Sequence, residues 1–309
     1  MHTEPGPKQT DSTNSDAFTN SGAEPAKPPL SGNCFITELV DSFRFEDAKL
    51  PSLPSAAIYL ERAIRDDSVS LAKLASLLEK DPVLAARLIR VANSAFYRAV
   101  TPVESVPVAV TRIGFSATRN IALVLLSNVF RARHKLVAER ISQLWNESLR
   151  TAAVASILTR HYPLIDSNRA MLGGLMYNVG AMLLLTKIDE KVRAIPHPMI
   201  LDQMIAKHAA RFGLMLLRFW EMDPDLLEVV AHRDNWQRNH EQSPDLADLI
   251  LVARSCIPVA DGAPIDFTFC ENLPAYQRMQ PFLHLPLPLS EFVTDAEDSV
   301  EQMLAVLSG

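Results

Sequence analysis

Apolar residues recur every three or four positions along most of the chain after residue 35, a spacing that places them on one face of an α-helix. The apolar residues between 71 and 78 form one such stripe. Asp81 and Pro82 then indicate a new helix, because aspartate favours the position before a helix and proline favours its first turn. No run alternates with a period of two, so the pattern predicts an all-α fold without a sheet.

Glycines and prolines divide the rest of the apolar pattern into further helices. We expect a short helix over 106–113 that stops at Gly114, and a buried helix over 117–130. The proline-rich stretch 258–290 should follow the surface in extended segments, because proline lacks the amide hydrogen that regular structure uses. Other helices are expected over 141–161, 166–185, 199–220, from Pro224, over 246–256 and over 292–307.

The chain divides into four regions. Residues 1–34 are rich in small polar residues and proline and should form a disordered tail, because they cannot bury enough apolar surface to offset the entropy of ordering. We expect an N-terminal helical lobe over 35–138 and a second helical lobe over 139–257. A wrapping segment and a closing helix complete the chain over 258–309.

Charge is unevenly distributed along the sequence. Residues 82–135 carry eight basic residues and only one acid, Glu104, a net charge of +7. Because the whole chain has a net charge of −6, the remaining residues carry a net charge of −13. Such an asymmetry is typical of a face that binds anions or a partner, or of a basic lobe docked on an acidic one, and the second explanation is the simpler. The arginines of a possible anion or partner face are Arg87, Arg90, Arg112 and Arg119.

Several classes of protein are disfavoured. No uninterrupted apolar run reaches the about 18 residues of a membrane span, and the N-terminus has no secretory apolar region, so we expect a cytoplasmic protein without membrane contact. Three widely separated cysteines argue against a disulfide framework and against a zinc knuckle.

One apolar segment carries a recognisable motif. Residues 174–180 read Gly-Leu-Met-Tyr-Asn-Val-Gly. This segment resembles the Gly-Leu-Leu-His-Asp-Ile-Gly motif of the HD metal-dependent phosphohydrolase superfamily, with Tyr177 and Asn178 in place of the metal-binding pair. A phenol is a poor ligand for a divalent metal, and a carboxamide lacks the negative charge that helps to hold one and activate its water.

A closer resemblance covers more of the chain. Residues 81–97 (Asp-Pro-Val-Leu-Ala-Ala-Arg-Leu-Ile-Arg-Val-Ala-Asn-Ser-Ala-Phe-Tyr) and 106–114 (Val-Pro-Val-Ala-Val-Thr-Arg-Ile-Gly) are similar to the pattern of the HDOD domain family, and the likeness extends over about 38–260. It implies a two-lobed, all-helical fold whose second lobe resembles a degenerate HD phosphohydrolase domain. It also implies a bacterial signal-transduction or regulatory module.

The resemblance also places the other metal-ligand positions. The first-helix histidine of catalytic relatives falls near Glu147, and the late aspartate falls on Arg254. Of the four positions, only Glu147 could act as a ligand, and the positive charge of Arg254 would repel a metal ion. We therefore expect a non-catalytic protein with no metal and no cofactor.

Two histidines, His208 and His232, fall at positions where the resembling families also carry histidine. They could form a residual pocket with Glu147, Asn178 and Arg254 that binds an anionic ligand without hydrolysing it. The simpler interpretation, which we favour, is two partly buried histidines that hydrogen-bond to the backbone.

The expected function is a regulatory module that binds a protein partner in a signalling pathway or a small signalling ligand. A cyclic dinucleotide is implied only by the context in which the family occurs, since the chain lacks the usual receptor motif. The alternatives are binding of nucleic acid or a nucleotide through 82–135 and, least supported, metal-dependent phosphohydrolase activity.

Overall fold

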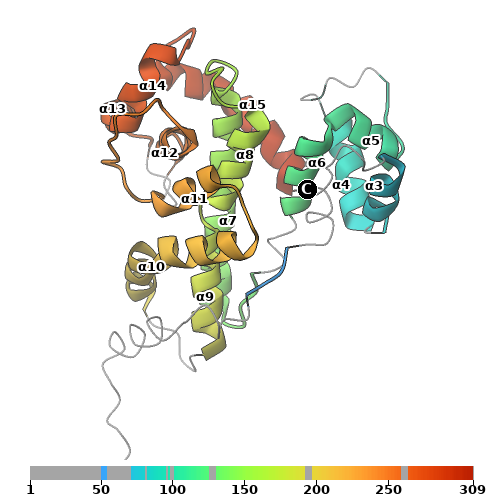
Figure 1. The fold of residues 1–309 in the computed structure, drawn as a ribbon, viewed down its shortest axis with the longest axis horizontal. Coiled ribbons are helices and arrows are strands. Elements are labelled where there is room, and N and C mark those ends of the chain that lie inside the picture. Colours follow the sequence, from blue (N-terminus) through green and yellow to red (C-terminus); the bar gives the residue numbers. More distant parts are fainter. Residues whose placement is uncertain are drawn as a thin grey trace, which may run out of the picture.

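The computed structural model describes residues 50–53, 71–80, 82–94, 97, 101–124, 130–191, 197–258 and 264–308. The described residues form helices and turns, with no strand among them, which confirms the predicted all-α class (Figure 1). The expected disordered tail, 1–34, lies outside the described residues.

The first lobe is a small helical cluster built on leucine side chains. Leu74, Leu78, Leu84 and Leu88 are buried completely. The predicted stop at Gly114 is confirmed, since this residue has a φ of 84°, a conformation that glycine adopts readily. The helices of the lobe are α3 (Leu71–Leu78), α4 (Pro82–Ala92), α5 (Val106–Ile113) and α6 (Phe115–Val124).

The loop between α4 and α5 is closed by one asparagine. Asn93 Nδ2 donates to the carbonyl of Val103 at 2.8 Å, and Asn93 Oδ1 accepts from the amide of Val103 at 2.7 Å. The side chain thus imitates a backbone partner at the end of α4.

The second lobe surrounds the long helix α7. Its helices are α7 (Lys135–Leu158), α8 (Ser167–Met176), α9 (Val179–Lys191), α10 (Pro198–Phe219), α11 (Pro224–Ala231) and α12 (Leu246–Ser255). Two predictions were wrong here. The long helix begins at Lys135 and not at Ile141, and the expected single helix over 166–185 is interrupted at Tyr177 and Asn178.

The early start of α7 depends on a carboxylate from another helix. Asp189 of α9 accepts hydrogen bonds from the amides of Arg133, at 2.7 Å, and His134, at 3.1 Å, just before α7 begins. Its Oδ1 also lies 2.7 Å from His134 Nδ1. Burial opposes ionisation of Asp189, but these hydrogen bonds outweigh it and hold the carboxyl pKa below its ordinary value. This contact ties the start of α7 to the last turn of α9.

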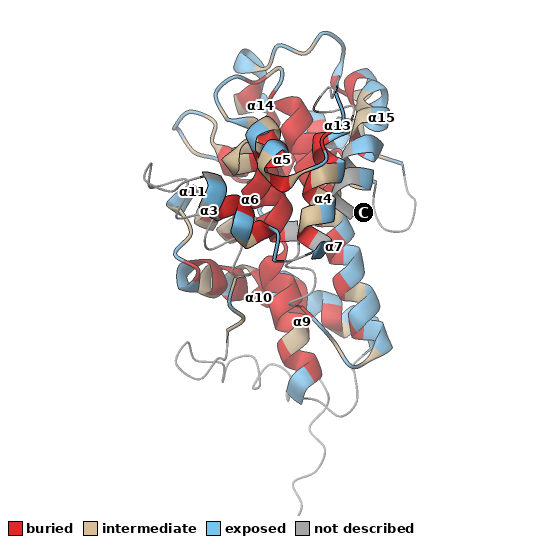
Figure 2. Ribbon diagram, turned by 90° about the vertical axis from the view of Figure 1, so that its right-hand side faces the viewer, coloured by how far each residue is buried: buried red, intermediate tan, exposed pale blue. Residues whose placement is uncertain are grey.

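Glycines allow the central helices to approach closely. A Cβ on Gly174 would lie 2.3 Å from the Cα of Ala152 in α7, and a Cβ on Gly180 would lie 2.1 Å from the carbonyl oxygen of Ala209 in α10. The stretch Ser167–Lys191 is apolar and long enough to cross a membrane, but 94% of its most apolar window is buried inside the protein. Figure 2 shows this burial along α9.

The C-terminal region corrects a further expectation. The stretch 258–290 was predicted to be extended, but its described part contains α13 (Phe267–Asn272), α14 (Pro274–Met279) and a 3-10 helix, η3 (Gln280–Phe282). Asp266 caps α13 by accepting from the amide of Phe269 at 3.0 Å, and Pro274 occupies the first turn of α14, where proline is tolerated.

The closing helix α15 (Leu289–Ser308) contacts helices of both lobes, namely α4, α6, α7 and α13. It crosses from one lobe to the other in Figure 1. Arg150 of α7 pairs with Glu301 at 2.7 Å and with Glu297 at 3.4 Å on this helix. The helix therefore ties the two lobes together.

We predict that Gly174→Ala lowers the free energy of unfolding by about 3 kcal/mol, because the new methyl group meets the backbone of α7. Gly173→Ala is the matched control, since its methyl group would meet only movable side-chain carbons of Ile250 and Leu246. Urea unfolding followed by circular dichroism measures both. Equal losses of unfolding free energy in the two variants would show that the close approach of α8 to α7 does not cause the effect of Gly174→Ala.

We predict that Asp189→Asn lowers stability by about 2 kcal/mol at pH 7, where the wild-type carboxylate is ionised and accepts charge-assisted hydrogen bonds. Because the folded pKa lies below the ordinary 3.8, this contribution is complete above pH 3.8 and disappears as the pH falls through the folded pKa. Unfolding curves of the two proteins should therefore converge in acid. A constant difference down to the lowest pH would contradict this account.

Candidate functional site

The break between α8 and α9 brings together the four residues that the family resemblance placed at metal-ligand positions. Tyr177 and Asn178 are completely buried there, facing Glu147 of α7 and Arg254 of α12. Asn178 Nδ2 donates to the carbonyl of Leu144 at 3.0 Å and lies 3.5 Å from Glu147 Oε2. The guanidinium of Arg254 lies 5.3 Å from the centre of the Tyr177 ring. Helices distant in sequence therefore meet at these side chains.

A second arginine, which the sequence analysis missed, completes the cluster. Arg233 Nη2 donates to Asn178 Oδ1 at 2.9 Å, and its side chain is only 4% exposed. Arg254 donates to the carbonyl of Arg233 and pairs with Asp234 at 2.9 Å. Burial and the charge of Arg254 lower the pKa of Arg233, although Asp234 opposes them. The only signal in the sequence was its place directly after His232.

This cluster does not fit a divalent metal. The oxygen of Asn178, which would have to bind the ion, already accepts a hydrogen bond from Arg233. Burial raises the pKa of Tyr177, so its phenol stays protonated. Glu147 is the single carboxylate among the four predicted positions, and the two guanidinium groups of Arg233 and Arg254 would repel a cation.

The two candidate histidines lie on α10 and at the end of α11. His208 is buried within α10, where it is 5% exposed. His232 ends α11 and lies 3.3 Å from Glu228 Oε2 on the same helix. Neither of these described residues lines the pocket that contains Glu147 and Arg254. A residual pocket formed by these histidines with Glu147, Asn178 and Arg254 stays a prediction.

The four arginines of the predicted anion or partner face do not share one exposed surface. Arg87 and Arg90 are neighbours on α4, where burial and the charge of Arg90 lower the pKa of Arg87. Arg112 donates to the carbonyl of Thr101 at 3.0 Å. Arg119 is only 6% exposed and lines a groove between α6 and the second lobe, because it lies on the inner side of α6.

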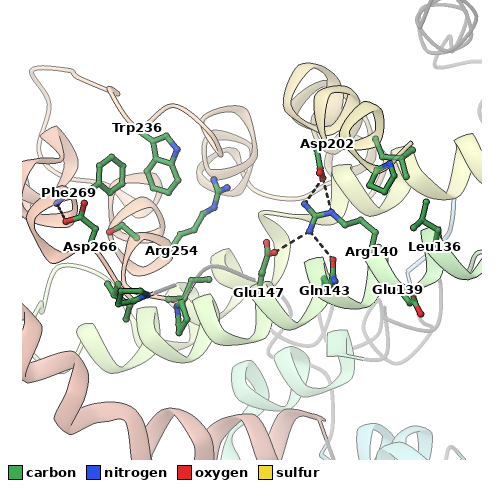
Figure 3. Close-up of a pocket in the computed structure, with 17 residues that line it drawn as sticks. Leu136, Glu139, Arg140, Gln143, Glu147, Asp202, Trp236, Arg254, Asp266 and Phe269 are labelled. Carbon is green, nitrogen blue, oxygen red and sulfur yellow. Dashed lines mark hydrogen bonds and ion pairs between the residues drawn. The ribbon is translucent and has the colours of Figure 1, made fainter. Parts of the chain in front are cut away.

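A pocket of about 720 Å³ adjoins the cluster, lined by parts of α7, α10, α12 and α13. Glu147 and Arg254 belong to both the cluster and the pocket wall. Figure 3 shows Trp236, Arg254 and Phe269 toward one end of the pocket, and Arg140 and Asp202 toward the other. The two aromatic rings therefore lie at one end of the pocket, and the ion pair of Arg140 with Asp202 lies at the other.

The polar side chains of the pocket are largely engaged with one another. Arg140 pairs with Asp202 at 2.9 Å and with Glu147 at 3.7 Å. Arg254 lies 4.7 Å from the Trp236 ring centre, a cation–π contact, and Trp236 meets Phe269 edge to face at 5.5 Å.

Another group of potential metal ligands, made of His240, Asp245 and Asp248, lies at the start of α12. Arg238 pairs with Asp248 at 2.8 Å, and Arg278 pairs with it at 2.6 Å. Burial opposes ionisation of Asp248, but the two arginines outweigh it and lower the pKa of the carboxyl. Asp245 and Asp248 also form a capping box. This network positions α12, and through it Arg254.

We predict that Arg233→Met lowers the free energy of unfolding by about 2 kcal/mol, because the buried oxygen of Asn178 loses its donor. His232→Ala is the adjacent control and should change stability by less than about 0.5 kcal/mol, since that side chain lies partly exposed outside the cluster. Chemical unfolding at neutral pH measures both. A variant at Arg233 as stable as the wild type would show that this hydrogen bond does not hold the cluster together.

Comparison with known proteins agrees with this architecture. A provisionally assigned metal-dependent phosphohydrolase of Shewanella amazonensis superposes with a TM-score of 0.71 at 24% identity, covering 89% of this chain and 98% of its own. An HDOD domain protein of unknown function from Geobacter sulfurreducens gives 0.65 at 20% identity, covering 88% and 96%. A provisionally assigned signal transduction protein of Marinobacter aquaeolei gives 0.61 at 21%, covering 91% and 67%.

Sequence comparison adds the family. An uncharacterised protein of Treponema pallidum is 24% identical over 242 residues, which are 73% of this chain but only 45% of that protein. This chain thus spans less than half the length of that curated relative. The HDOD domain matches residues 50–236, more than half of the sequence. The chain belongs to the HDOD domain family.

Proposed function

We propose that this chain is a non-catalytic signalling module that acts by binding a partner in the pocket beside the degenerate site. The main support is the use of Asn178, whose amide nitrogen and oxygen are both hydrogen-bonded within the protein. Arg233 and Arg254 add positive charge where a metal would lie. A site of this kind holds helices in register, and it leaves no ligand set for a catalytic ion.

The pocket offers a route from binding to a change in shape. Glu147 and Arg254 line the pocket and also belong to the cluster, so a partner that displaces either side chain alters how α7 packs on α12. Helix α7 contacts α15, which in turn contacts α4 and α6 of the first lobe. A binding event in the second lobe therefore has a continuous packed path to the first, which double-mutant cycles can test.

The similar Marinobacter aquaeolei protein, described as a signal transduction protein, supports a regulatory role for this fold. The described part of the chain also gives little support to an exposed anion-binding face, because Arg119 points into the protein. We therefore place recognition at the pocket and not on the basic segment.

We predict that the purified protein contains no stoichiometric divalent metal and does not hydrolyse bis(p-nitrophenyl) phosphate with added manganese. Elemental analysis and release of nitrophenol measure the two properties. Glu147→Gln removes the one remaining carboxylate, and Glu241→Gln is a control on an exposed loop. Turnover that is lost in the first variant and kept in the second would overturn the proposal.

A further inference from the structure

The charge that the pocket presents is negative. Its wall contains the carboxylates Glu139, Glu147, Asp202 and Asp266 and the guanidinium groups of Arg140 and Arg254. Both arginines are already paired, Arg140 with Asp202 and Glu147, and Arg254 with Asp234. The wall therefore carries four carboxylates against two guanidinium groups, so its net charge is negative.

Two of these carboxylates are accessible. Glu139 is 57% exposed and pairs with the exposed Lys135 at 3.6 Å, an interaction that contributes little in water. Asp202 is 54% exposed beside Arg140. Glu139 comes from α7 and Asp202 from α10, so negative charge reaches the pocket wall from two helices.

The same pocket has an apolar end. Phe269 is 41% exposed and packs edge to face on Trp236. At the opposite end of the pocket, Leu136 is 37% exposed near Arg140 (Figure 3), and Met199, 64% exposed, follows the pocket residue Pro198. Large apolar side chains that remain exposed around a hollow are typical of protein-binding surfaces, where aromatic residues and methionine are enriched.

Resting on the proposed function, we propose that this pocket binds a basic segment of a partner protein, with an apolar side chain against Trp236 and Phe269 and an arginine or lysine near Glu139 and Asp202. The volume of about 720 Å³ suits a few side chains. A ligand with two phosphates is the less suitable occupant, because its negative charges would meet a wall of net negative charge whose two arginines are ion-paired with carboxylates of the protein.

The test is selection of binders from a random peptide display library on the full chain, followed by fluorescence anisotropy of the selected peptides. We expect them to carry net positive charge and at least one large apolar residue. Binding should weaken at least about tenfold in the double variant Glu139→Lys and Asp202→Lys, and should weaken with added salt. Glu241→Lys with Asp295→Lys makes the same change of charge at exposed positions outside the pocket and should bind as the wild type.

Phe269→Ala removes an exposed side chain without a change of charge, so it tests the apolar end even if the double variant folds poorly. It should also weaken binding at least about tenfold, as expected for a central aromatic contact. Selection of no peptide, or of peptides whose affinity is unchanged in all pocket variants, would overturn the inference.

One outcome separates the two proposals. Acidic or uncharged peptides that lose binding in Phe269→Ala would overturn the basic segment and leave a binding function at the pocket. Metal-dependent hydrolysis that requires Glu147 would overturn the non-catalytic function itself.

Discussion

The hydrogen bond between Arg233 and the Asn178 carboxamide is the interaction on which the second lobe depends. It joins the turn between α8 and α9 to the segment after α11, and Asn178 also holds the carbonyl of Leu144 in α7. A buried guanidinium is costly unless partners satisfy it, and the bond from Arg233 Nη2 to Asn178 is the only hydrogen bond of this group, since Nε and Nη1 make none within the described part of the chain. Arg254 reinforces this arrangement by donating to the carbonyl of Arg233.

The position of Arg254 has its own support at the other end of α12. Asp248, completely buried, accepts from Arg238 and Arg278 and closes a capping box with Asp245. One network therefore fixes where α12 begins, and the other fixes where its last turn points. The pocket lies between elements that both networks hold, so its wall is preorganised.

Much of the fold could be predicted from local pattern, because helix periodicity and proline position act within a few residues. The stop at Gly114 and the restart at Pro224 are examples. Contacts made across the fold could not be predicted in this way. The start of α7 depends on Asp189, which is distant in sequence, and Cys270 Sγ donates to the carbonyl of Ser255 at 3.0 Å only because α13 packs on α12.

The residues of the candidate site also fall into those that could be predicted from the sequence and those that only the fold brings in. Resemblance predicted which residues occupy the ligand positions, and the structure brings Glu147, Tyr177, Asn178 and Arg254 together. The role of Arg233 was not predictable, because nothing in its sequence neighbourhood indicates that it turns inward to meet Asn178. The pocket was also missed, since Trp236 and Phe269 meet only through tertiary packing.

The coupling of Arg254 to Asp234 and to the carbonyl of Arg233 means that a change at this position affects two neighbours at once. A single change of Arg254 to aspartate would place a carboxylate near Asp234 and Glu147 and leave the buried Arg233 with a disrupted neighbour. Without Arg254, the carbonyl of Arg233 loses a donor and Asp234 loses one of its two paired charges. We therefore expect Arg254, Asp234 and Arg233 to vary as a set among related chains, because a change at one removes a partner of another.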